Sequence, residues 1–435
     1  NDSGAKALVC LANMGHLAEK VIPKTEIQTV VITEVGDFLP PFKRFLVNNV
    51  VKYVKKMVPA FHIPNAQKLN DILALGSKKA ARNANPDSGD LAVLQYTGGT
   101  TGVAKGAMLT HRNLIANMLQ AKAVMASNLG EGTETIVAPL PLYHIYAFTF
   151  HCMAMMMTGN NNLLITNPRD LPSMIKDLKN NKFTGFVGLN TLFAALCNNS
   201  DFRKLNFSNL KMTVSGGMAL QIATAERWTE VTGSQVCEGF GMTETSPIAT
   251  VNPIQNIKLG TIGIPVSSTL CKVIDEDGKE LPLGETGELC VKGPQVMKGY
   301  WLQEDATKEV LDEDGWLRTG DIGIIQEDGY IRLVDRKKDM ILVSGFNVYP
   351  NELEDVLATL PGVLQSAAIG IPDEKSGEAI KVFITVRPGD SLTKEQVIAH
   401  MRSNLTGYKV ARHVEFRDEL PVTNVGKILR RQLRD

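Results

Sequence analysis

The sequence predicts an α/β protein with a large layered domain, residues 1–337, followed by a small α+β domain, residues 338–435. A chain of 435 residues is long enough to build more than one hydrophobic core. Its first part alternates strand-like and helix-like segments, which is typical of α/β layering. The charged run 335–339 then joins two stretches that each have the pattern of a folded domain.

Composition favours an ordinary globular protein and gives no reason to expect nucleic acid as a partner. Apolar residues make up 44% of the chain, and 46 basic residues balance 46 acidic ones. The six cysteines lack C-x-x-C spacing, which indicates reduced thiols in a cytoplasmic protein rather than disulfides or a zinc site. The longest apolar run, around 145–157, is too short to span a bilayer.

The first elements are a strand at 8–12, a helix at 16–21 and a strand at 29–33. The stretch 41–59 then combines an apolar stripe with five cations: Lys43, Arg44, Lys52, Lys55 and Lys56. Two interpretations stay open for it. One is a helix on a membrane surface, and the other is a surface helix that packs its stripe against the body of the protein.

A glycine–threonine loop follows the strand-like run 91–94 and has the composition of a phosphate-binding loop. Gly98, Gly99 and Gly102 allow successive backbone N–H groups to point at one anion, and Lys105 adds a positive charge. The hydroxyls come from Thr97, Thr100 and Thr101. A Walker A loop is excluded, because Ala104 and Gly106 stand where that motif requires glycine and Ser or Thr. The loop therefore predicts polyphosphate binding.

Between this loop and residue 220 the pattern predicts further strands and helices. A helix runs from Thr110, its cap, to about 127, and a buried strand at 135 leads into a proline-rich turn that carries His144. The methionine-rich run 153–157 fits helix packing or the lining of a lipid tunnel. Strand, glycine and helix succeed one another over 183–193, and a strand at 212–215 ends in Gly216 and Gly217.

A second block with chemical potential lies at 238–247. Gly239 and Gly241 flank Phe240, so that its ring is a flat platform on which a purine can stack. Thr243 and Glu244 follow, and they supply the oxygen ligands that Mg²⁺ takes near phosphates. A single Gly-x-Thr-Glu turn is weak evidence for nucleotide binding by itself. Together with the upstream glycine–threonine loop it becomes strong evidence.

The last third predicts a small β subdomain over 260–300, and then a chain segment rich in charged residues. Asp321 suits a bidentate grip on ribose hydroxyls, and Arg336 suits phosphate or ribose oxygens. The small domain is expected to contain a helix at 352–359, strands at 367–370 and 380–386, and a helix at 394–404. Lys427 lies in a glycine-containing loop near the end of the chain.

These motifs resemble the signatures of the adenylate-forming (ANL) superfamily, which includes acyl-CoA synthetases, luciferases and peptide-synthetase adenylation domains. The run from Tyr96 to Asn113 is similar to its nucleotide-binding signature, and the remaining blocks occur in superfamily order up to Lys427. The details resemble those of bacterial long-chain fatty acid–CoA ligases. The resemblance implies that a leading segment of the large domain is absent here.

The resemblance implies the following reaction and site. A fatty acid is activated with Mg²⁺ and ATP to an acyl-adenylate, and coenzyme A then displaces AMP. Catalytic roles fall to Lys427, Glu244, Thr243 and Lys105, with Glu244 and Thr100 as metal ligands. The nucleotide-binding residues are Thr97, Gly98, Gly99, Thr100, Thr101, Gly102, Lys105, Gly217, Glu238, Gly239, Phe240, Gly241, Thr243, Asp321 and Arg336. The acyl pocket takes His144, Gly188, Asn190, Gly216 and Met242, the hinge of a mobile small domain is Lys338, and the coenzyme A passage is Ser344, Gly345 and Phe346.

Two departures from the family pattern bear on these roles. Met218 and Ala219 follow the glycine pair where the family usually has a proline, and Phe240 stands where many relatives carry tyrosine. The alternatives are a related adenylating enzyme, such as an aryl-CoA ligase or an acyl-AMP ligase, and a fragment that binds nucleotide or lipid without turnover. Peripheral contact with the inner face of the cytoplasmic membrane and a homodimer are further alternatives that the sequence leaves open.

Overall fold

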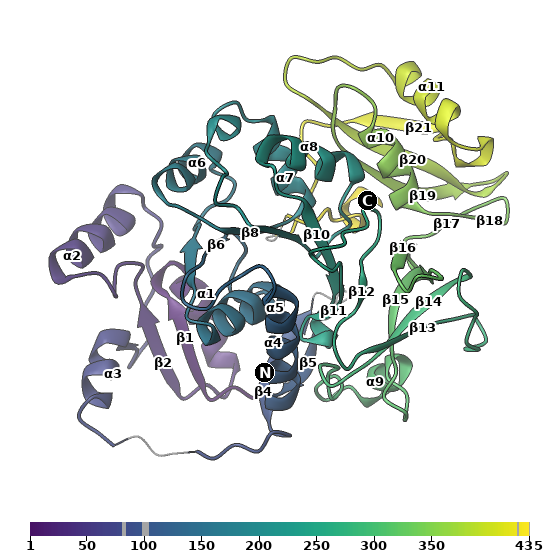
Figure 1. Ribbon diagram of the computed structural model, residues 1–435. Helices are drawn as coiled ribbons and strands as arrows, with labels where there is room; N and C mark the ends of the chain where they lie inside the picture. Colours follow the sequence, from purple (N-terminus) through teal and green to yellow (C-terminus); the bar gives the residue numbers. More distant parts are fainter. Residues whose placement is uncertain (81–83, 98–103, 424–425, 435) are drawn as a thin grey trace. The chain divides into compact units, whose positions relative to one another are not determined.

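The chain forms two compact units in a computed structural model that describes residues 1–80, 84–97, 104–423 and 426–434. The units are residues 1–87 and 88–435 (Figure 1). The predicted α/β fold class is confirmed, and so is the small α+β domain at the carboxyl end of the chain. Five of the predicted phosphate-loop residues, Gly98, Gly99, Thr100, Thr101 and Gly102, lie outside the described residues.

The first unit is built on a three-stranded parallel sheet in the order β1-β2-β3. Its strands are β1 (Ala7–Leu11), β2 (Thr29–Thr33) and β3 (Gln67–Lys68), and its helices are α1 (Gly15–Val21), α2 (Pro41–Asn49) and α3 (Leu69–Gly76). A π-helical turn, Val50–Val54, extends α2. Neither α2 nor this turn contains a fully buried residue, and both interpretations of the stretch remain predictions.

The second unit is organised around a seven-stranded sheet in the order β12-β11-β10-β9-β8-β6-β7. The strands from β7 to β10 are parallel, whereas β11 and β12 are antiparallel to their neighbours. Their bounds are β6 (Thr135–Ala138), β7 (Asn161–Leu164), β8 (Gly185–Gly188), β9 (Met212–Ser215), β10 (Val236–Gly241), β11 (Ile248–Val251) and β12 (Ile264–Pro265).

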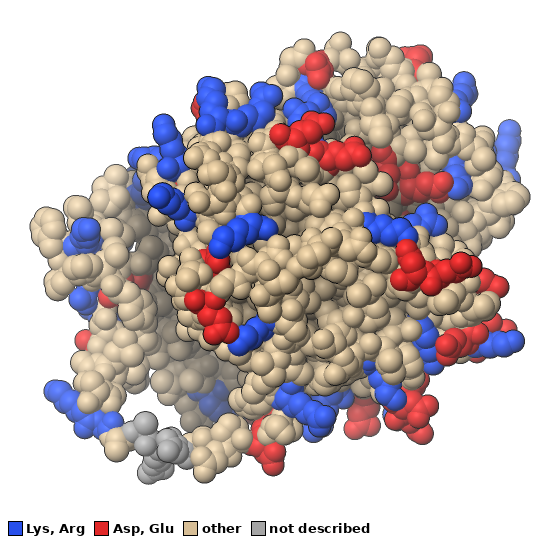
Figure 2. Space-filling view, viewed as in Figure 1, with Lys and Arg blue, Asp and Glu red and all other residues tan. Residues whose placement is uncertain are grey.

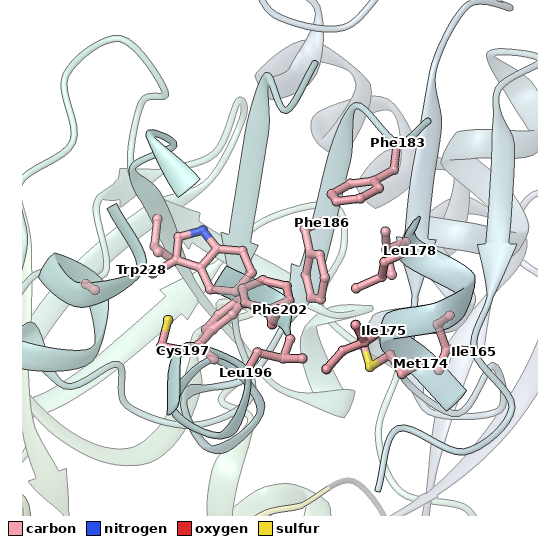
Figure 3. Close-up of a cluster of buried hydrophobic side chains, with 14 of the residues drawn as sticks. Ile165, Met174, Ile175, Leu178, Phe183, Phe186, Leu196, Cys197, Phe202 and Trp228 are labelled. Carbon is pink, nitrogen blue, oxygen red and sulfur yellow. The ribbon is translucent and has the colours of Figure 1, made fainter. Parts of the chain in front are cut away.

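Helices cover both faces of this sheet, as expected when parallel strands are connected by crossovers. Apolar residues of α6 (Leu171–Asn180), α7 (Asn190–Asn198) and α8 (Ile222–Thr232) pack on one face. On the other face lie α4 (His111–Met125), α5 (Ile145–Ala147) and the π-helical segment Phe148–Met155. The first face carries an aromatic cluster that includes Phe186, Phe202 and Trp228 (Figure 3). The ring centroids of Phe186 and Trp228 are 5.1 Å apart.

Two smaller sheets complete the part of unit 2 that precedes residue 338. β4 (Leu91–Thr97) pairs antiparallel with β5 (Lys105–Thr110), so Thr97 lies opposite Lys105 at the two ends of the glycine–threonine loop. A four-stranded antiparallel sheet contains β13 (Leu270–Ile274), β14 (Thr286–Lys292), β15 (Leu317–Ile325) and β16 (Ile331–Arg336), with α9 (Glu304–Val310) between β14 and β15. The predicted charged bridge therefore begins inside a strand, because Asp335 and Arg336 belong to β16.

The remaining residues form a five-stranded sheet with helices beside it (Figure 1). Its strands are β17 (Ile341–Val343), β18 (Phe346–Val348), β19 (Val363–Asp373), β20 (Gly377–Val386) and β21 (His413–Phe416). The helices are α10 (Pro350–Ala358), α11 (Lys394–Asn404) and α12 (Arg431–Arg434). The helix predicted at 394–404 is confirmed at both ends, whereas the strand expected at 367–370 is only the centre of the longer β19.

Candidate active site

A cavity of about 2170 Å³ opens at the carboxyl ends of β8, β9 and β10. In open α/β sheets this edge is where ligands bind, because the loops that leave parallel strands converge there. The structure brings most of the described site candidates to its wall: Thr97, Lys105, His144, Asn190, Gly216, Gly217, Glu238, Gly239, Phe240, Gly241, Met242, Thr243, Glu244, Asp321, Arg336, Lys338 and Lys427.

The segment around Phe240 explains why glycines flank the aromatic ring. A side chain at Gly241 would overlap the backbone carbonyl of Pro247, and the pairing of β10 with β11 is irregular between Phe240 and Gly241. Gly217, in the neighbouring loop, has φ +84°, a conformation that L side chains rarely adopt. Both glycines therefore let the backbone turn closely beside the cavity, with the ring of Phe240 on its wall.

Glu238 is a buried carboxyl group at the same end of β10. Its Oε1 accepts a hydrogen bond of 3.0 Å from the backbone N–H of Leu220, which follows the glycine pair of β9. Burial raises the pKa of Glu238 to about 8, because the charged form is poorly solvated there. At neutral pH this group is therefore largely protonated and can donate as well as accept a hydrogen bond.

Lys105 and Glu244 are connected through a residue that lies far from both in the sequence. Glu244 is buried in the turn Thr243–Thr245, and its Oε1 accepts a hydrogen bond of 2.6 Å from the hydroxyl of Tyr300. The Nζ of Lys105 lies over the ring of the same tyrosine, 5.1 Å from its centroid. Glu244 and Lys105 thus both contact the side chain of Tyr300 at the cavity wall, the first at its hydroxyl and the second at its ring.

Asp321, Arg336 and Lys427 form the charged side of the cavity. Asp321 of β15 lies opposite Arg336 of β16, with 3.3 Å between its Oδ1 and the Nε of the arginine. Burial raises the pKa of Asp321, while Arg336 and Lys427 act in the opposite direction. The pKa of Lys427 is lowered to about 7 by burial and by Arg336, and Asp321 partly offsets this.

Described residues of the segment that carries Lys427 form two hydrogen bonds with the large body of unit 2. The hydroxyl of Thr191 in α7 donates to the carbonyl of Gly426 over 3.4 Å, and the guanidinium of Arg169 donates to the carbonyl of Thr423 over 3.4 Å. Lys427 also acts on His144, whose pKa is lowered by burial first and by the lysine second. The small domain is therefore positioned with its lysine inside the cavity.

An apolar chamber adjoins this charged region. His144 caps α5, and its Nδ1 accepts a hydrogen bond of 3.3 Å from the N–H of Tyr146. Behind it the wall is made of side chains from α4, α5 and the central strands, among them Met125, Tyr146 and Val214. Asn190 is held at the start of α7 by reciprocal hydrogen bonds of 3.1 Å with Gln221.

Several candidates are not brought to the cavity. Gly188 is packed against the aromatic core, where a Cβ atom would lie 2.8 Å from the ring of Phe193. Ser344 and Gly345 form the tight turn between β17 and β18, and Phe346 stacks on Tyr408 with 4.8 Å between ring centroids. None of these four predicted residues lines the cavity. The methionines at 153–157 do not line it either, and Met155 is buried in the core.

Two family models match the chain. That of the AMP-binding enzymes matches residues 1–301, and that of the AMP-binding enzyme C-terminal domain matches residues 352–427. The chain belongs to the AMP-binding enzyme family. It is 53% identical to a long-chain-fatty-acid–CoA ligase of Escherichia coli O6:H1 over 436 residues, which covers all of this chain and 77% of the relative.

Solved structures of adenylating enzymes share the fold. The anthranilate CoA ligase AuaEII, in complex with anthranoyl-AMP, superposes with a TM-score of 0.86 at 26% identity, over 100% of this chain and 78% of its own. ATP-bound MatB from Rhodopseudomonas palustris gives a TM-score of 0.78 at 29% identity, over 96% of this chain and 80% of its own. The resemblance to the adenylate-forming superfamily is thereby confirmed.

The donor set at the cavity is compatible with Mg²⁺ bound to phosphates. Thr243 and Glu244 present oxygen atoms, which a hard cation prefers, on the wall that also holds Lys105. Within the described ranges no group of three or more His, Cys, Asp and Glu side chains could hold a metal ion by itself. Such a site is compatible with a cation that takes most of its ligands from phosphates and water.

Some residues at the site were not predicted from sequence. Tyr300 carries the contacts to Lys105 and Glu244, and Gln221 holds Asn190. Arg430 binds Glu354 through three hydrogen bonds of 2.7, 2.8 and 3.3 Å. The signal for Tyr300 is weak, because an aromatic residue after a glycine is common in turns. In the described part of the chain, no helix has the length and apolarity needed to cross a bilayer.

Proposed function

We propose that this chain is a long-chain fatty acid–CoA ligase that activates a fatty acid with ATP to an acyl-adenylate and transfers the acyl group to coenzyme A. The observation that carries the proposal is one continuous cavity. It joins the Phe240 and Asp321 walls, which suit a nucleotide, to an apolar chamber, with Lys427 and His144 where the two regions meet. The 53% identical relative supports the same activity.

The proposed reaction has two steps, adenylation and thioester formation. In the first, a carboxylate oxygen of the fatty acid attacks the α-phosphorus of ATP, an oxygen–phosphorus bond forms, and pyrophosphate leaves. In the second, the thiolate of coenzyme A attacks the acyl carbonyl carbon, and AMP leaves with the carbon–oxygen bond electrons. Mg²⁺, held by Glu244 with Thr243 and Thr100 as further candidate ligands, would offset the negative charge of the phosphates.

The chain's own residues have separate tasks in this proposal. Lys427 stabilises the charge that develops at the α-phosphate and carboxylate, which preorganised donors do effectively in a water-poor site. Asp321 grips the ribose hydroxyls, with Arg336 beside it, and the Phe240 ring stacks on the adenine. Lys105 and the glycine–threonine loop bind the β- and γ-phosphates. His144, Asn190, Gly216 and Met242 border the acyl group.

The small domain is proposed to begin at Lys338, with residues 1–337 as the large domain. Lys427 lies inside the cavity, whereas the turn at Ser344–Phe346 does not line it. These are the positions that adenylation requires, because the lysine must then be close to the phosphates. For thioester formation, the small domain is proposed to rotate about Lys338, withdraw Lys427 and present the turn to coenzyme A.

The helix formed by α2 and the π-helical turn is proposed to contact the anionic inner face of the cytoplasmic membrane. Phe42, Phe45 and Val54 are 79, 69 and 71% exposed, and Lys52, Lys55 and Lys56 lie in the same stretch. Exposed apolar side chains beside cations gain energy both from insertion and from attraction to anionic lipid. Such contact would deliver a sparingly soluble substrate to the enzyme.

The activity is tested with purified protein, ATP, Mg²⁺, coenzyme A and fatty acids of graded length. Pyrophosphate and acyl-CoA should both appear, with long chains preferred, and omission of coenzyme A should leave acyl-adenylate on the protein. Aryl acids provide the matched comparison: their preferential use would indicate an aryl-CoA ligase. Pyrophosphate without thioester would indicate an acyl-AMP ligase, and absence of both would reduce the protein to a binding role.

A further inference from the structure

Tyr300 contacts two of the proposed catalytic residues at once. Its hydroxyl lies 2.6 Å from Oε1 of Glu244, and its ring lies beneath the Nζ of Lys105, 5.1 Å from it. An ionised carboxylate only accepts hydrogen bonds, so the phenol is the donor in this pair. The tyrosine is 7% exposed and lines the cavity, so these contacts are formed largely out of bulk water.

The backbone around Tyr300 is fixed to the elements that carry its two partners. The N–H of Met297 donates to the carbonyl of Glu244 over 2.8 Å, and the N–H of Trp301 donates to the carbonyl of Gly106 over 2.8 Å. The N–H of Tyr300 itself donates to the hydroxyl of Thr307 over 2.8 Å. The phenol therefore holds a defined place between β5, which begins at Lys105, and the turn that carries Glu244.

We propose that Tyr300 is a positioning residue that sets the orientation of the Glu244 carboxylate and the place of the Lys105 ammonium group. With Oε1 engaged by the phenol, the carboxylate presents its other oxygen to Mg²⁺ and the phosphates. The ring face attracts the ammonium group and restricts a flexible side chain to one position. The proposal rests on the proposed function, because both partners act there on the Mg²⁺–ATP complex.

The alternative is that Tyr300 only fills the core, where it packs with residues such as Leu109 and Met297. The chain offers a matched control for this alternative. Tyr330 is also 7% exposed, its hydroxyl donates to the carbonyl of Asn256 over 2.6 Å, and the Nζ of Lys258 lies 5.3 Å from its ring centroid. Tyr330 does not line the cavity, and its hydroxyl donates to a backbone carbonyl instead of a carboxylate, so it provides a comparable buried tyrosine without a contact to a proposed catalytic residue.

The experiment compares Tyr300→Phe with Tyr330→Phe. Each variant loses one buried hydroxyl and keeps its ring, so both should lose some thermal stability. Tyr300→Phe alone should raise the Mg²⁺ concentration for half-maximal pyrophosphate release, by roughly tenfold or more, since a hydrogen bond to a charged group is lost. Tyr330→Phe should leave that concentration unchanged, and an equal Mg²⁺ requirement in both variants would overturn the proposal.

Calorimetry of ATP binding separates the two contacts and does not depend on turnover. Tyr300→Phe should weaken ATP binding in the presence of Mg²⁺ and leave binding without Mg²⁺ unchanged, because the ring still holds Lys105. Tyr300→Leu removes the ring as well and should weaken both. If wild-type protein binds ATP but forms no acyl-CoA, the proposed function fails while this test still decides the role of Tyr300.

A double-mutant cycle completes the test. If Tyr300 acts through Glu244, then Tyr300→Phe should have little further effect on Mg²⁺-dependent ATP affinity once Glu244 has been changed to Gln. Additive losses from the two substitutions would show that Tyr300 does not act through this carboxylate, and would overturn that half of the proposal.

Discussion

Lys427 is a buried ammonium group with other cations around it. Burial lowers its pKa most, Arg336, Lys338 and Arg430 lower it further, and Asp321 opposes them, with the result that the pKa is about 7. In the free protein the ammonium form is therefore only partly populated at neutral pH. The negative phosphates of ATP would favour the charged form, so binding of the nucleotide would prepare the residue that is proposed to stabilise the transition state.

The first prediction concerns this lysine. Lys427→Ala should lower the rate of acyl-adenylate formation by roughly a hundredfold or more, as happens when a charge-stabilising donor is removed. The thioester step, started from supplied acyl-adenylate, should keep nearly its normal rate, because the lysine is withdrawn at that stage. The two half-reactions are measured separately, and equal losses in both would contradict the assigned role.

The second prediction concerns Glu238 and pH. Burial raises the pKa of Glu238 in the folded protein to about 8, above the usual value of 4.5, so between these values the folded state retains a proton that the unfolded state has lost. Below about pH 4.5 this group is protonated in both states and does not change the free energy of unfolding. As the pH rises from there to about 8, the group lowers the free energy of unfolding. Glu238→Gln keeps an acceptor for Leu220 and cannot titrate.

The melting temperature of Glu238→Gln, relative to wild type, should therefore rise between pH 5 and pH 8. Glu313→Gln, at an exposed position, is the matched control and should show no such trend. A pH-independent difference for Glu238→Gln would mean that the carboxyl group is ionised throughout this range in the folded protein.

At the residue scale, sequence reasoning identified candidates but not their neighbours. Phe240 between two glycines, and Asp321 and Arg336 in charged segments, could be selected by residue type and spacing. That Asp321 lies opposite Arg336 depends on the register of β15 and β16, which no local pattern specifies. Tyr300 was not predicted for the same reason, since Glu244 is 56 residues away in the sequence and Lys105, at the start of β5, is still further away.

At the scale of elements, local signals worked where periodicity or caps were present. Thr393 and Gln396 form a capping box at the start of α11, and Thr110 and Asn113 form one before α4. The apolar run after His144 was harder to interpret. It contains a π-helical segment, Phe148–Met155, and a nearly continuous apolar run has no periodicity from which this could be predicted.

The third prediction belongs to the exposed helix of the first unit. Replacement of Lys52, Lys55 and Lys56 by glutamate should abolish co-sedimentation with vesicles that contain anionic lipid, because attraction becomes repulsion. Activity on a soluble short-chain acid should not change. Vesicles of neutral lipid serve as the control for apolar insertion alone, and unchanged sedimentation of the variant with anionic vesicles would exclude the proposed membrane contact.

At the scale of the whole molecule, charges of both signs are interspersed over the visible face of residues 88–435 (Figure 2). The two α/β layers and the small terminal sheet follow from the sequence pattern, since strand and helix signals alternate throughout. The position of the small domain at the cavity does not follow from the sequence pattern, because it depends on contacts between residues that are far apart in the sequence. One of them crosses the proposed hinge: the N–H of Asn351 donates to Oδ2 of Asp335 over 2.7 Å.

The fourth prediction tests the hinge. Lys338→Pro fixes φ at that position near −65° and leaves intact the bonds that Lys337 and Asp339 donate to Gly320 and Arg336. Acyl-adenylate should still form, because the present arrangement already has Lys427 in the cavity, while thioester production should fall steeply. Lys338→Ala is the matched control, because it removes the side chain and keeps the torsion free. An equal loss in both half-reactions for Lys338→Pro would argue against rotation at this residue.

The separation between Lys427 and the turn at Ser344–Phe346 also has a kinetic meaning. A protein that cannot present both to one cavity at the same time must let pyrophosphate depart before the thiol arrives. Initial rates measured against ATP, at several fixed concentrations of coenzyme A, should then give parallel double-reciprocal lines. The rotation of one small domain would thus determine the order in which substrates bind and products leave, and the acyl-adenylate would stay bound between pyrophosphate release and coenzyme A binding.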